Sequence, residues 1–283
     1  MRVKPTPVIT LGLAIGYLAI MAITWVVVGV DYNTVGDSTA NVARGIVLPV
    51  ALASVFMAAA TSYLGWWRPA IHEGMRVPRW LWAVPILMVL PGLGSLLGGF
   101  GPADRTAPYL LTLAVGTLLV GFGEEMLTRG TGLVGLRGRF GEPLSWFFSC
   151  LLFGLIHALN VFFEQSLGST LQQILIAFVA GSVLYITRRV SGTLIVCMLL
   201  HAWIDFTTFA FSDAVADAES PFVVFSFAQW GAYILAIIGV VVVLSRGGSQ
   251  REASILTVLW ASTPRPHHVW APVRSSSRVR SKP

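Results

Sequence analysis

Long apolar stretches separated by short polar loops run through most of the chain. A helix needs about 20 mostly apolar residues to cross the hydrocarbon core of a bilayer. Eight stretches approach this length: residues 8–30, 46–67, 80–100, 108–127, 144–163, 171–187, 190–211 and 222–244. The third contains Pro85 and Pro91, so we expect it to be kinked or broken, and the sixth is short. The pattern predicts an all-α protein, a polytopic transmembrane helical bundle of about eight spans, with seven as the alternative.

The composition excludes an ordinary soluble protein. Of the 283 residues, 55% are hydrophobic and 11% are charged, whereas about a quarter of the residues of a soluble globular protein are charged. We therefore expect one transmembrane domain, residues 1–245, followed by a basic, disordered cytoplasmic tail, residues 246–283. The net charge of +6 comes from loops and tail, where basic residues indicate orientation and contact with the lipid bilayer rather than with nucleic acid.

Basic and acidic loops alternate along the chain. The basic segments hold Arg2, Lys4, Arg68, Arg76, Arg79, Arg129, Arg137, Arg139, Arg188, Arg189 and the tail. The loops between them hold Asp31, Asp37, Asp104, Glu164, Asp213, Asp217 and Glu219, with few basic residues. Because cytoplasmic loops are enriched in Lys and Arg, we predict that both termini are cytoplasmic. We expect a multi-pass protein of a prokaryotic plasma membrane.

The fourth stretch ends in a run of ionisable residues. Such side chains are costly within a bilayer and usually mark a functional site. Glu124 and Glu125 point about 100° apart on a helix, so they cannot share one role. Glu125 and Arg129 are spaced i,i+4 and can pair, which leaves Glu124 as a candidate general base. The alternative is a charge cluster at the membrane surface.

The fifth and seventh stretches carry histidines. Phe153 and His157 share one helix face, and Asn160 lies close to that face one turn later. His201 and Asp205 are also spaced i,i+4, so the aspartate could set the tautomer of the histidine. The alternative for both stretches is hydrogen bonding between helices without catalysis.

The three motifs in this order indicate a function more specifically than any one of them does alone. EExxxR, FxxxH and HxxxD on three separate spans resemble the CAAX-protease and bacteriocin-processing family of intramembrane glutamic endopeptidases, which includes the Rce1-type prenyl-protein endopeptidases. The resemblance covers roughly residues 108–211, with Arg129 and Phe153 at the motif arginine and phenylalanine. The third motif of the family often carries asparagine where this chain has Asp205.

The resemblance implies roles for these residues. Its catalytic set is Glu124, His157, His201 and Asp205. Its supporting set is Glu125, Arg129, Phe153 and Asn160, in which the first two would orient the site. Glu124 and His157 would activate a water that attacks the scissile carbonyl, and His201 and Asp205 would stabilise the oxyanion. An ionised aspartate is no hydrogen-bond donor, so Asp205 would have to be protonated for that role.

The implied mechanism requires no cofactor. Two histidines with two or three carboxylates could also hold zinc. The HExxH pattern of common zinc peptidases is absent from the sequence, so zinc is not favoured.

The expected depths of the motif residues disagree. If Arg129 marks the cytoplasmic interface, Glu124 lies roughly 7 Å inside, whereas His157 lies roughly 16 Å beyond Trp146. Either the fourth helix runs deeper and the glycine-rich segment 130–135 re-enters the membrane, or the expected boundaries are wrong. In both cases water must reach the site, and we expect a cavity open to the cytoplasm.

Three functions are compatible with these residues. The favoured one is an intramembrane endopeptidase that hydrolyses membrane-associated peptides or proteins near the cytoplasmic face. A transporter could use the same residues as a proton relay, but we find no clear internal repeat and the ionisable residues gather in three spans. A non-proteolytic scaffold would not need every polar motif position to be occupied. The sequence does not indicate the natural substrate or the oligomeric state.

Overall fold

The computed structural model describes residues 1–75, 77–98, 105–211 and 221–262, and the chain forms two units, Met1–Leu244 and Ser245–Pro283. The described residues contain no β-strand, only one isolated bridge between His72 and Thr193. Seven helical segments are long and apolar enough to cross a membrane, and the shorter Leu194–Ala210 is an eighth apolar helix. The prediction of an all-α bundle of about eight spans is confirmed.

The predicted orientation in the membrane and the predicted domain boundary stay predictions. The cytoplasmic location of the termini and the division into a peptidase domain and a tail are not tested. Arg76, Asp104, Asp213, Asp217, Glu219 and residues 263–283 lie outside the described residues.

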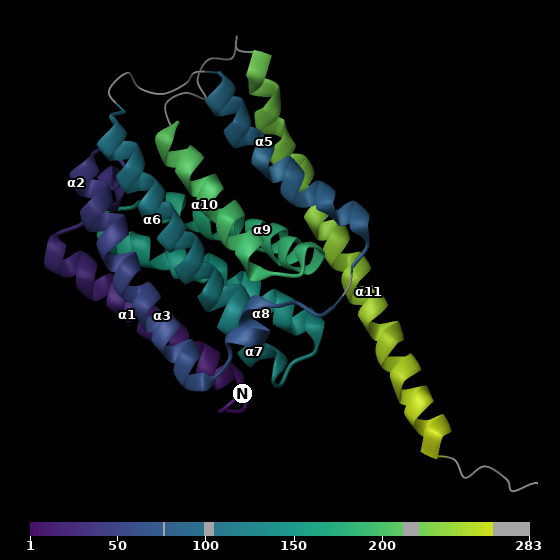
Figure 1. Ribbon diagram of the computed structural model, residues 1–283. Coiled ribbons are helices and arrows are strands. Elements are labelled where there is room, and N and C mark those ends of the chain that lie inside the picture. The colour runs from purple at the N-terminus through teal and green to yellow at the C-terminus, as the bar shows by residue number, and fades with distance from the viewer. Residues whose placement is uncertain (76, 99–104, 212–220, 263–283) are drawn as a thin grey trace, which may run out of the picture. The chain divides into compact units, whose positions relative to one another are not determined.

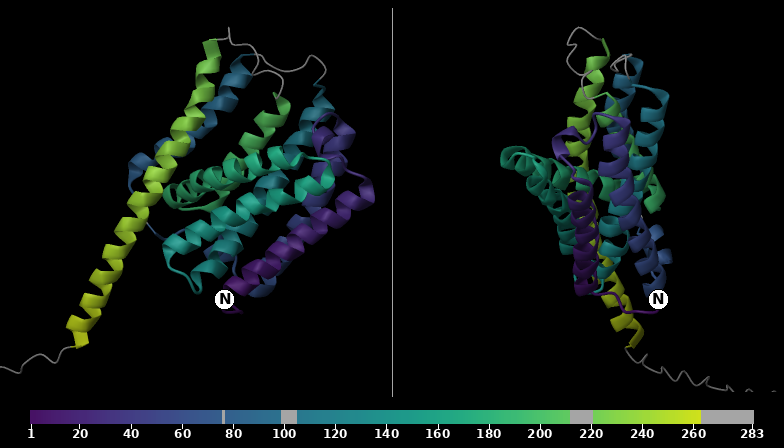
Figure 2. Two further views of the ribbon diagram at one scale, coloured as in Figure 1. Left: turned by 180° about the vertical axis from the view of Figure 1, so that it is seen from behind. Right: turned by 90° about the vertical axis from the view of Figure 1, so that its left-hand side faces the viewer.

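Helices of the first unit run back and forth between two ends of the bundle (Figures 1 and 2). In chain order they are α1 (Pro7–Val28), α2 (Thr39–Val42), α3 (Leu48–Leu64), α4 (Trp67–Ile71), α5 (Ala83–Leu97), α6 (Ala107–Glu125), α7 (Thr131–Arg137), α8 (Glu142–Leu155), α9 (Leu167–Ser191), α10 (Leu194–Ala210) and α11 (Ala228–Ser262), of which residues 228–244 belong to this unit. Short π-helical turns, Ala43–Val47 and Met126–Gly130, precede α3 and α7. Short 3₁₀ segments lie at Tyr32–Thr34, Arg79–Trp82, Ile156–Phe163 and Pro221–Phe227.

Local sequence signals explain where several helices start and stop. Side chains of Thr106, Ser166 and Thr193 accept hydrogen bonds from backbone N–H groups in the first turns of α6, α9 and α10. Gly192, at φ 75°, ends α9 in the left-handed conformation and lets α10 begin two residues later. Pro91 lies inside α5 without interrupting it, so the third span is not broken there.

Two predicted spans have different lengths in the structure. The sixth is not short, because α9 extends over 25 residues and includes polar residues at both of its ends. The fourth does not stop at Leu127. The π-helical turn Met126–Gly130 joins α6 to α7, and one apolar helical run of 31 residues, Ala107–Arg137, results. Hydropathy places the end of a span at the first polar residues. The helix itself continues through polar residues whose side chains and backbone groups form hydrogen bonds or ion pairs with other helices.

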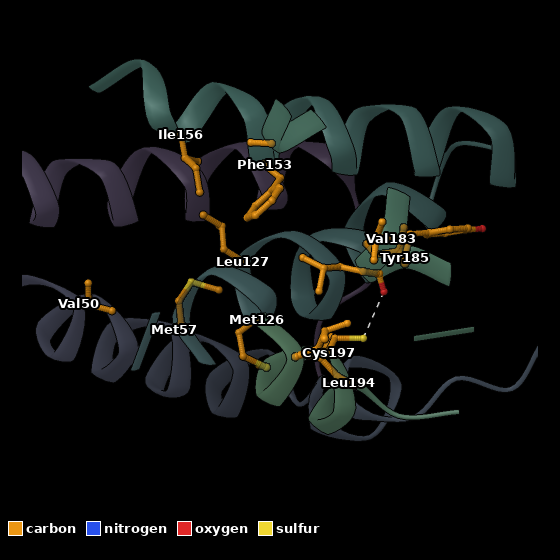
Figure 3. Packing of buried hydrophobic residues seen from close by; sticks show 14 of the residues in the cluster. Val50, Met57, Met126, Leu127, Phe153, Ile156, Val183, Tyr185, Leu194 and Cys197 are labelled. Carbon is orange, nitrogen blue, oxygen red and sulfur yellow. Dashed lines mark hydrogen bonds between the residues drawn. The ribbon is translucent and has the colours of Figure 1, made fainter. Parts of the chain in front are cut away.

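The core of the bundle forms around this long fourth segment. Figure 3 shows Leu127 between Met57 of α3 and Phe153 of α8, with Val50 of α3 and Met126 on the two sides of Met57. All five side chains are at most 4% exposed. The end of the fourth segment that carries the ionisable motif is therefore held inside the protein and does not face the lipid.

A charged cluster ties together the end of the bundle where α7 and α9 finish. Glu73, in the loop after α4, lies 2.9 Å from Arg137 Nη1 and 3.4 Å from Arg188 Nε through its Oε2 atom. Glu142, at the start of α8, lies 2.6 Å from Arg137 Nη2 and 3.1 Å from Arg189 Nη1. The two carboxylates thus pair with three guanidinium groups that would be costly to bury alone, and they offset most of the positive charge.

The pKa of Glu73 reflects this cluster. Burial alone would raise the pKa of its carboxyl, but the charges of Arg137, Arg188 and Arg189 outweigh burial and hold it below its ordinary value. A carboxyl with a depressed pKa stabilises the fold fully above the pKa of the unfolded chain, about 4.3, and loses this contribution as the pH falls through the folded-state pKa.

We therefore predict that Glu73→Gln lowers the thermal unfolding temperature in detergent at pH 7, by an amount equivalent to roughly 3 kcal/mol, because it leaves the buried Arg188 without its carboxylate. At pH 4 the difference from the wild type should be smaller. Asp37→Asn, at an exposed acid in the loop after α1, is the matched control and should change little. An equal loss of stability at pH 7 and pH 4 would contradict the conclusion that the ionised Glu73 carboxylate stabilises the fold.

Candidate active site

The predicted catalytic residues meet at one cavity of about 300 Å³. Glu124 reaches it from α6, His157 from the 3₁₀ segment after α8, and His201 and Asp205 from α10. Asn160 also lines it. Three spans that are far apart in the sequence therefore place their ionisable side chains around a common space, as expected for a site rather than for separate structural contacts.

His201 is the centre of the electrostatic contacts. Its Nδ1 atom lies 3.1 Å from Glu125 Oε1, and its Nε2 atom lies 3.5 Å from Asp205 Oδ2 and 4.0 Å from Glu124 Oε2. Carboxylate oxygens face both ring nitrogens, and both nitrogens can donate only in the imidazolium form. The sequence predicted Asp205 as the partner of His201, and the structure adds Glu125 on the opposite ring nitrogen.

The predicted pair of Glu125 and Arg129 is present and completely buried. Arg129 Nη1 donates to Glu125 Oε1 at 2.9 Å and to Thr128 Oγ1 at 2.7 Å. The side chains of Glu125 and Arg129 are both 0% exposed. Arg188 donates to the backbone carbonyl of Arg129. Arg129 is thus an interior residue of the bundle.

Phe153 joins the supporting pair to the two histidines. The guanidinium of Arg129 lies 3.9 Å from the centroid of its ring, a distance at which a cation is attracted to an aromatic face. The same ring packs edge-on against His157 and His201, with centroid distances of 5.6 and 5.3 Å. Phe153 therefore restricts the orientation of both imidazoles.

His157 has a defined tautomer. Its Nδ1 atom lies 2.9 Å from the carbonyl oxygen of Phe153. A carbonyl only accepts, so Nδ1 carries the hydrogen and a neutral ring keeps a lone pair on Nε2. Within the described residues no hydrogen bond or ion pair joins His157 to Glu124. The two residues share the cavity, and a molecule between them would be needed to link them.

Asn160 begins a chain of polar groups that sequence patterns did not reveal. It donates to Gln173 Oε1 at 2.9 Å, and Gln173 in turn donates to the hydroxyl of Tyr32 at 3.1 Å. All three residues line the cavity. Gln173 and Tyr32 carry no charge and match no motif, so only the packing of α9 and of the segment after α1 against the site identifies them.

The disagreement in depth disappears because the fourth helix is longer than expected. Glu124 lies 13 residues before Arg137, the end of the helical run, which is roughly 20 Å at 1.5 Å per residue. His157 is roughly 16 Å from Trp146 on the same basis. The glycine-rich segment 130–135 continues the helix as the last π-helical residue and the first part of α7.

The cavity extends toward one end of the bundle. Tyr32 and Val35 follow α1, Gln173 lies near the start of α9, and Phe209 lies near the end of α10. These segments are at the end opposite the N-terminus (Figure 1). The basic residues of the cluster around Glu73 are at the other end. The expectation of a cavity open to the cytoplasm stays a prediction.

The described residues hold no group of three or more His, Cys, Asp or Glu side chains arranged to bind a metal ion. Independence from a metal stays a prediction, because it concerns the reaction and not the arrangement alone.

Comparison with known proteins identifies the central part of the chain. Residues 106–207 match the family model described as type II CAAX prenyl endopeptidase Rce1-like. No curated protein and no solved structure matches the chain. The resemblance to the CAAX-protease and bacteriocin-processing family is therefore confirmed over the segment that contains all three motifs, and the matched family is one of proteases. The chain as a whole is a multi-pass integral membrane protein.

The site depends on the close approach of α6 and α10. A Cβ atom at Gly121 would clash with the backbone carbonyl of Met198, and its neighbour would be Ala202 at 3.3 Å. We predict that Gly121→Ala separates the two helices and lowers stability by about 1–3 kcal/mol, as overpacking does. Thermal unfolding in detergent measures this. Gly12→Ala in α1, where a Cβ would meet nothing within 4 Å, is the control; equal stability of the two variants would contradict the prediction.

Proposed function

We propose that this chain, with its Rce1-like segment, is an endopeptidase of a prokaryotic plasma membrane that hydrolyses peptide bonds of membrane-associated proteins or peptides. The observation that carries the proposal is the meeting of Glu124, His157 and His201 at one buried cavity within the spans. One oxygen of the Glu124 carboxylate has no hydrogen-bond partner within the described residues, so it is available as a base. The imidazoles of His157 and His201 line the same cavity, and one of them can act as a hydrogen-bond donor.

The reaction would begin with a water between Glu124 and the Nε2 lone pair of His157. As the water oxygen bonds to the scissile carbonyl carbon, the Glu124 carboxylate takes its proton, and the carbonyl oxygen becomes an oxyanion. The Nε2–H of a protonated His201 would face this negative charge. Collapse of the tetrahedral intermediate breaks the C–N bond, and the proton held by Glu124 passes to the leaving amine. No cofactor takes part.

Glu125, Arg129 and Asp205 act indirectly in this scheme. The buried charge of Arg129 balances that of Glu125, which in turn holds Nδ1 of His201. Asp205 Oδ2, 3.5 Å from Nε2, favours the protonated ring. Asp205 therefore supports the donor as an ionised acid, and it does not need to be protonated to replace the asparagine common in the family.

We predict that Glu124→Gln and His157→Ala each reduce cleavage of a membrane-associated peptide by about 10²–10⁴-fold, because each removes a group that handles the proton of water. The assay uses purified protein in liposomes, with Glu164→Gln, an exposed glutamate in the loop before α9, as the matched control. Retention of full cleavage by both variants would overturn the assignment. Solute flux that these substitutions block, without any cleavage, would indicate a transporter, and neither activity would indicate a scaffold.

The geometry also supports a direction of access to the site. The cavity lining comes from the end of the bundle that carries Asp31, Asp37 and Glu164, whereas Arg2, Lys4, Arg68, Arg79, Arg137 and Arg139 belong to the other end. If the basic end is cytoplasmic, as charge asymmetry predicts, the substrate bond is cut in the half of the membrane away from the cytoplasm. This revises the expectation of cleavage near the cytoplasmic face.

Cysteine labelling in intact cells tests the direction. Asp37→Cys and Arg139→Cys replace exposed residues at the two ends, and the native Cys150 and Cys197 are buried. We expect a membrane-impermeant maleimide to label Asp37→Cys in intact cells and Arg139→Cys only after permeabilisation. The reverse pattern would place the cavity on the cytoplasmic side.

A further inference from the structure

Tyr17 brings a further polar group to the cavity from α1, a helix outside the matched segment 106–207. Tyr17 is only 2% exposed, and its hydroxyl has no hydrogen-bond partner within the part of the chain that the structure describes. Several buried hydroxyls elsewhere in the bundle bond to a backbone carbonyl, as Thr10 does with Gly132 at 3.0 Å. The Tyr17 hydroxyl is an exception, and it lies at the candidate active site.

The hydroxyl lies close to the backbone that carries the candidate base. A Cβ atom at Gly123 would be 3.1 Å from the Tyr17 oxygen and 3.3 Å from the Cε2 atom of its ring. The absence of a side chain at Gly123 therefore leaves room for the end of the tyrosine directly beside Glu124. Glu124 Oε2 is likewise buried without a hydrogen-bond partner. Two residues with unsatisfied polar atoms thus line one cavity.

A buried hydroxyl without a partner costs free energy that a phenylalanine would avoid. Phenylalanine would fill the same space against α3 and α6. The hydroxyl is therefore explained best by a partner that occupies the cavity during the reaction. A phenol is a neutral donor, so it can face a negative charge without first gaining a proton, which an aspartate such as Asp205 cannot do.

We propose that Tyr17 is a catalytic residue whose hydroxyl donates a hydrogen bond to the oxyanion of the tetrahedral intermediate, beside His201. This inference rests on the proposed function, since it assigns a role in peptide-bond hydrolysis. The hydroxyl keeps its proton throughout, and no bond to Tyr17 forms or breaks. A donor that bonds to the developing charge more strongly than to the substrate carbonyl raises the rate without tightening substrate binding.

The test is Tyr17→Phe, assayed in liposomes with the peptide substrate used for the Glu124 variants. We expect kcat to fall by about 100-fold, as on removal of one oxyanion donor, with KM unchanged within about twofold. Tyr233→Phe is the matched control: Tyr233 in α11 is 7% exposed, its hydroxyl accepts from Gln229 at 2.8 Å, and it does not line this cavity. It should keep the wild-type kcat. A Tyr17→Phe variant with the wild-type kcat, or with a changed KM only, would overturn the proposal.

A binding measurement separates this proposal from the proposed function. The ligand is a phosphinate analogue of the same peptide, in which a tetrahedral, anionic phosphorus replaces the scissile carbonyl. Tyr17→Phe should bind it about 100-fold more weakly than the wild type, with Tyr233→Phe unaffected. If the wild type fails to cleave any peptide, the proposed function fails. Equal phosphinate binding by the wild type and Tyr17→Phe would overturn the role of Tyr17 alone.

Discussion

The buried ion pair between Glu125 and Arg129 is the interaction on which the site depends. Both side chains are fully excluded from solvent, so each charge would be very costly without the other. Glu125 also binds His201, and Arg129 lies over Phe153, which packs on both histidines. One pair on the fourth span thus connects the fifth and seventh spans, and the three motifs form a single packed unit.

The helices can form this unit because α6 and α10 come close together. Gly121 allows the backbone of Met198 to pack directly on α6, and the π-helical turn that follows Glu125 keeps the chain helical through Arg129. A helical run that continues to Arg137 places the acids deep in the bundle, where Glu124 lines the cavity. The charged cluster around Glu73 lies at the other end of the bundle and holds the ends of α7 and α9 together.

Several features of the site could be predicted from the sequence because they depend on one helix at a time. The i,i+4 spacing pairs Glu125 with Arg129 and places Asp205 beside His201 wherever the helices lie. The order of the motifs points to a protease family, and the apolar stretches predict about eight spans. The predicted end at Leu127 was wrong because hydropathy does not register a polar turn that is satisfied by partners from other helices, such as the carbonyl of Arg129 bound by Arg188.

The sequence by itself determined the class of fold, the identity of the motif residues and the pairs within each helix, since these follow from helical periodicity and from the cost of charge in a bilayer. Only the tertiary structure decided the second partner of His201, the end toward which the cavity extends, and the presence of Tyr17, Tyr32 and Gln173 around it. The reason is that contacts between helices depend on how side chains pack across long separations in the chain. Uncharged residues such as Tyr17 carry no signal until that packing brings them to the site.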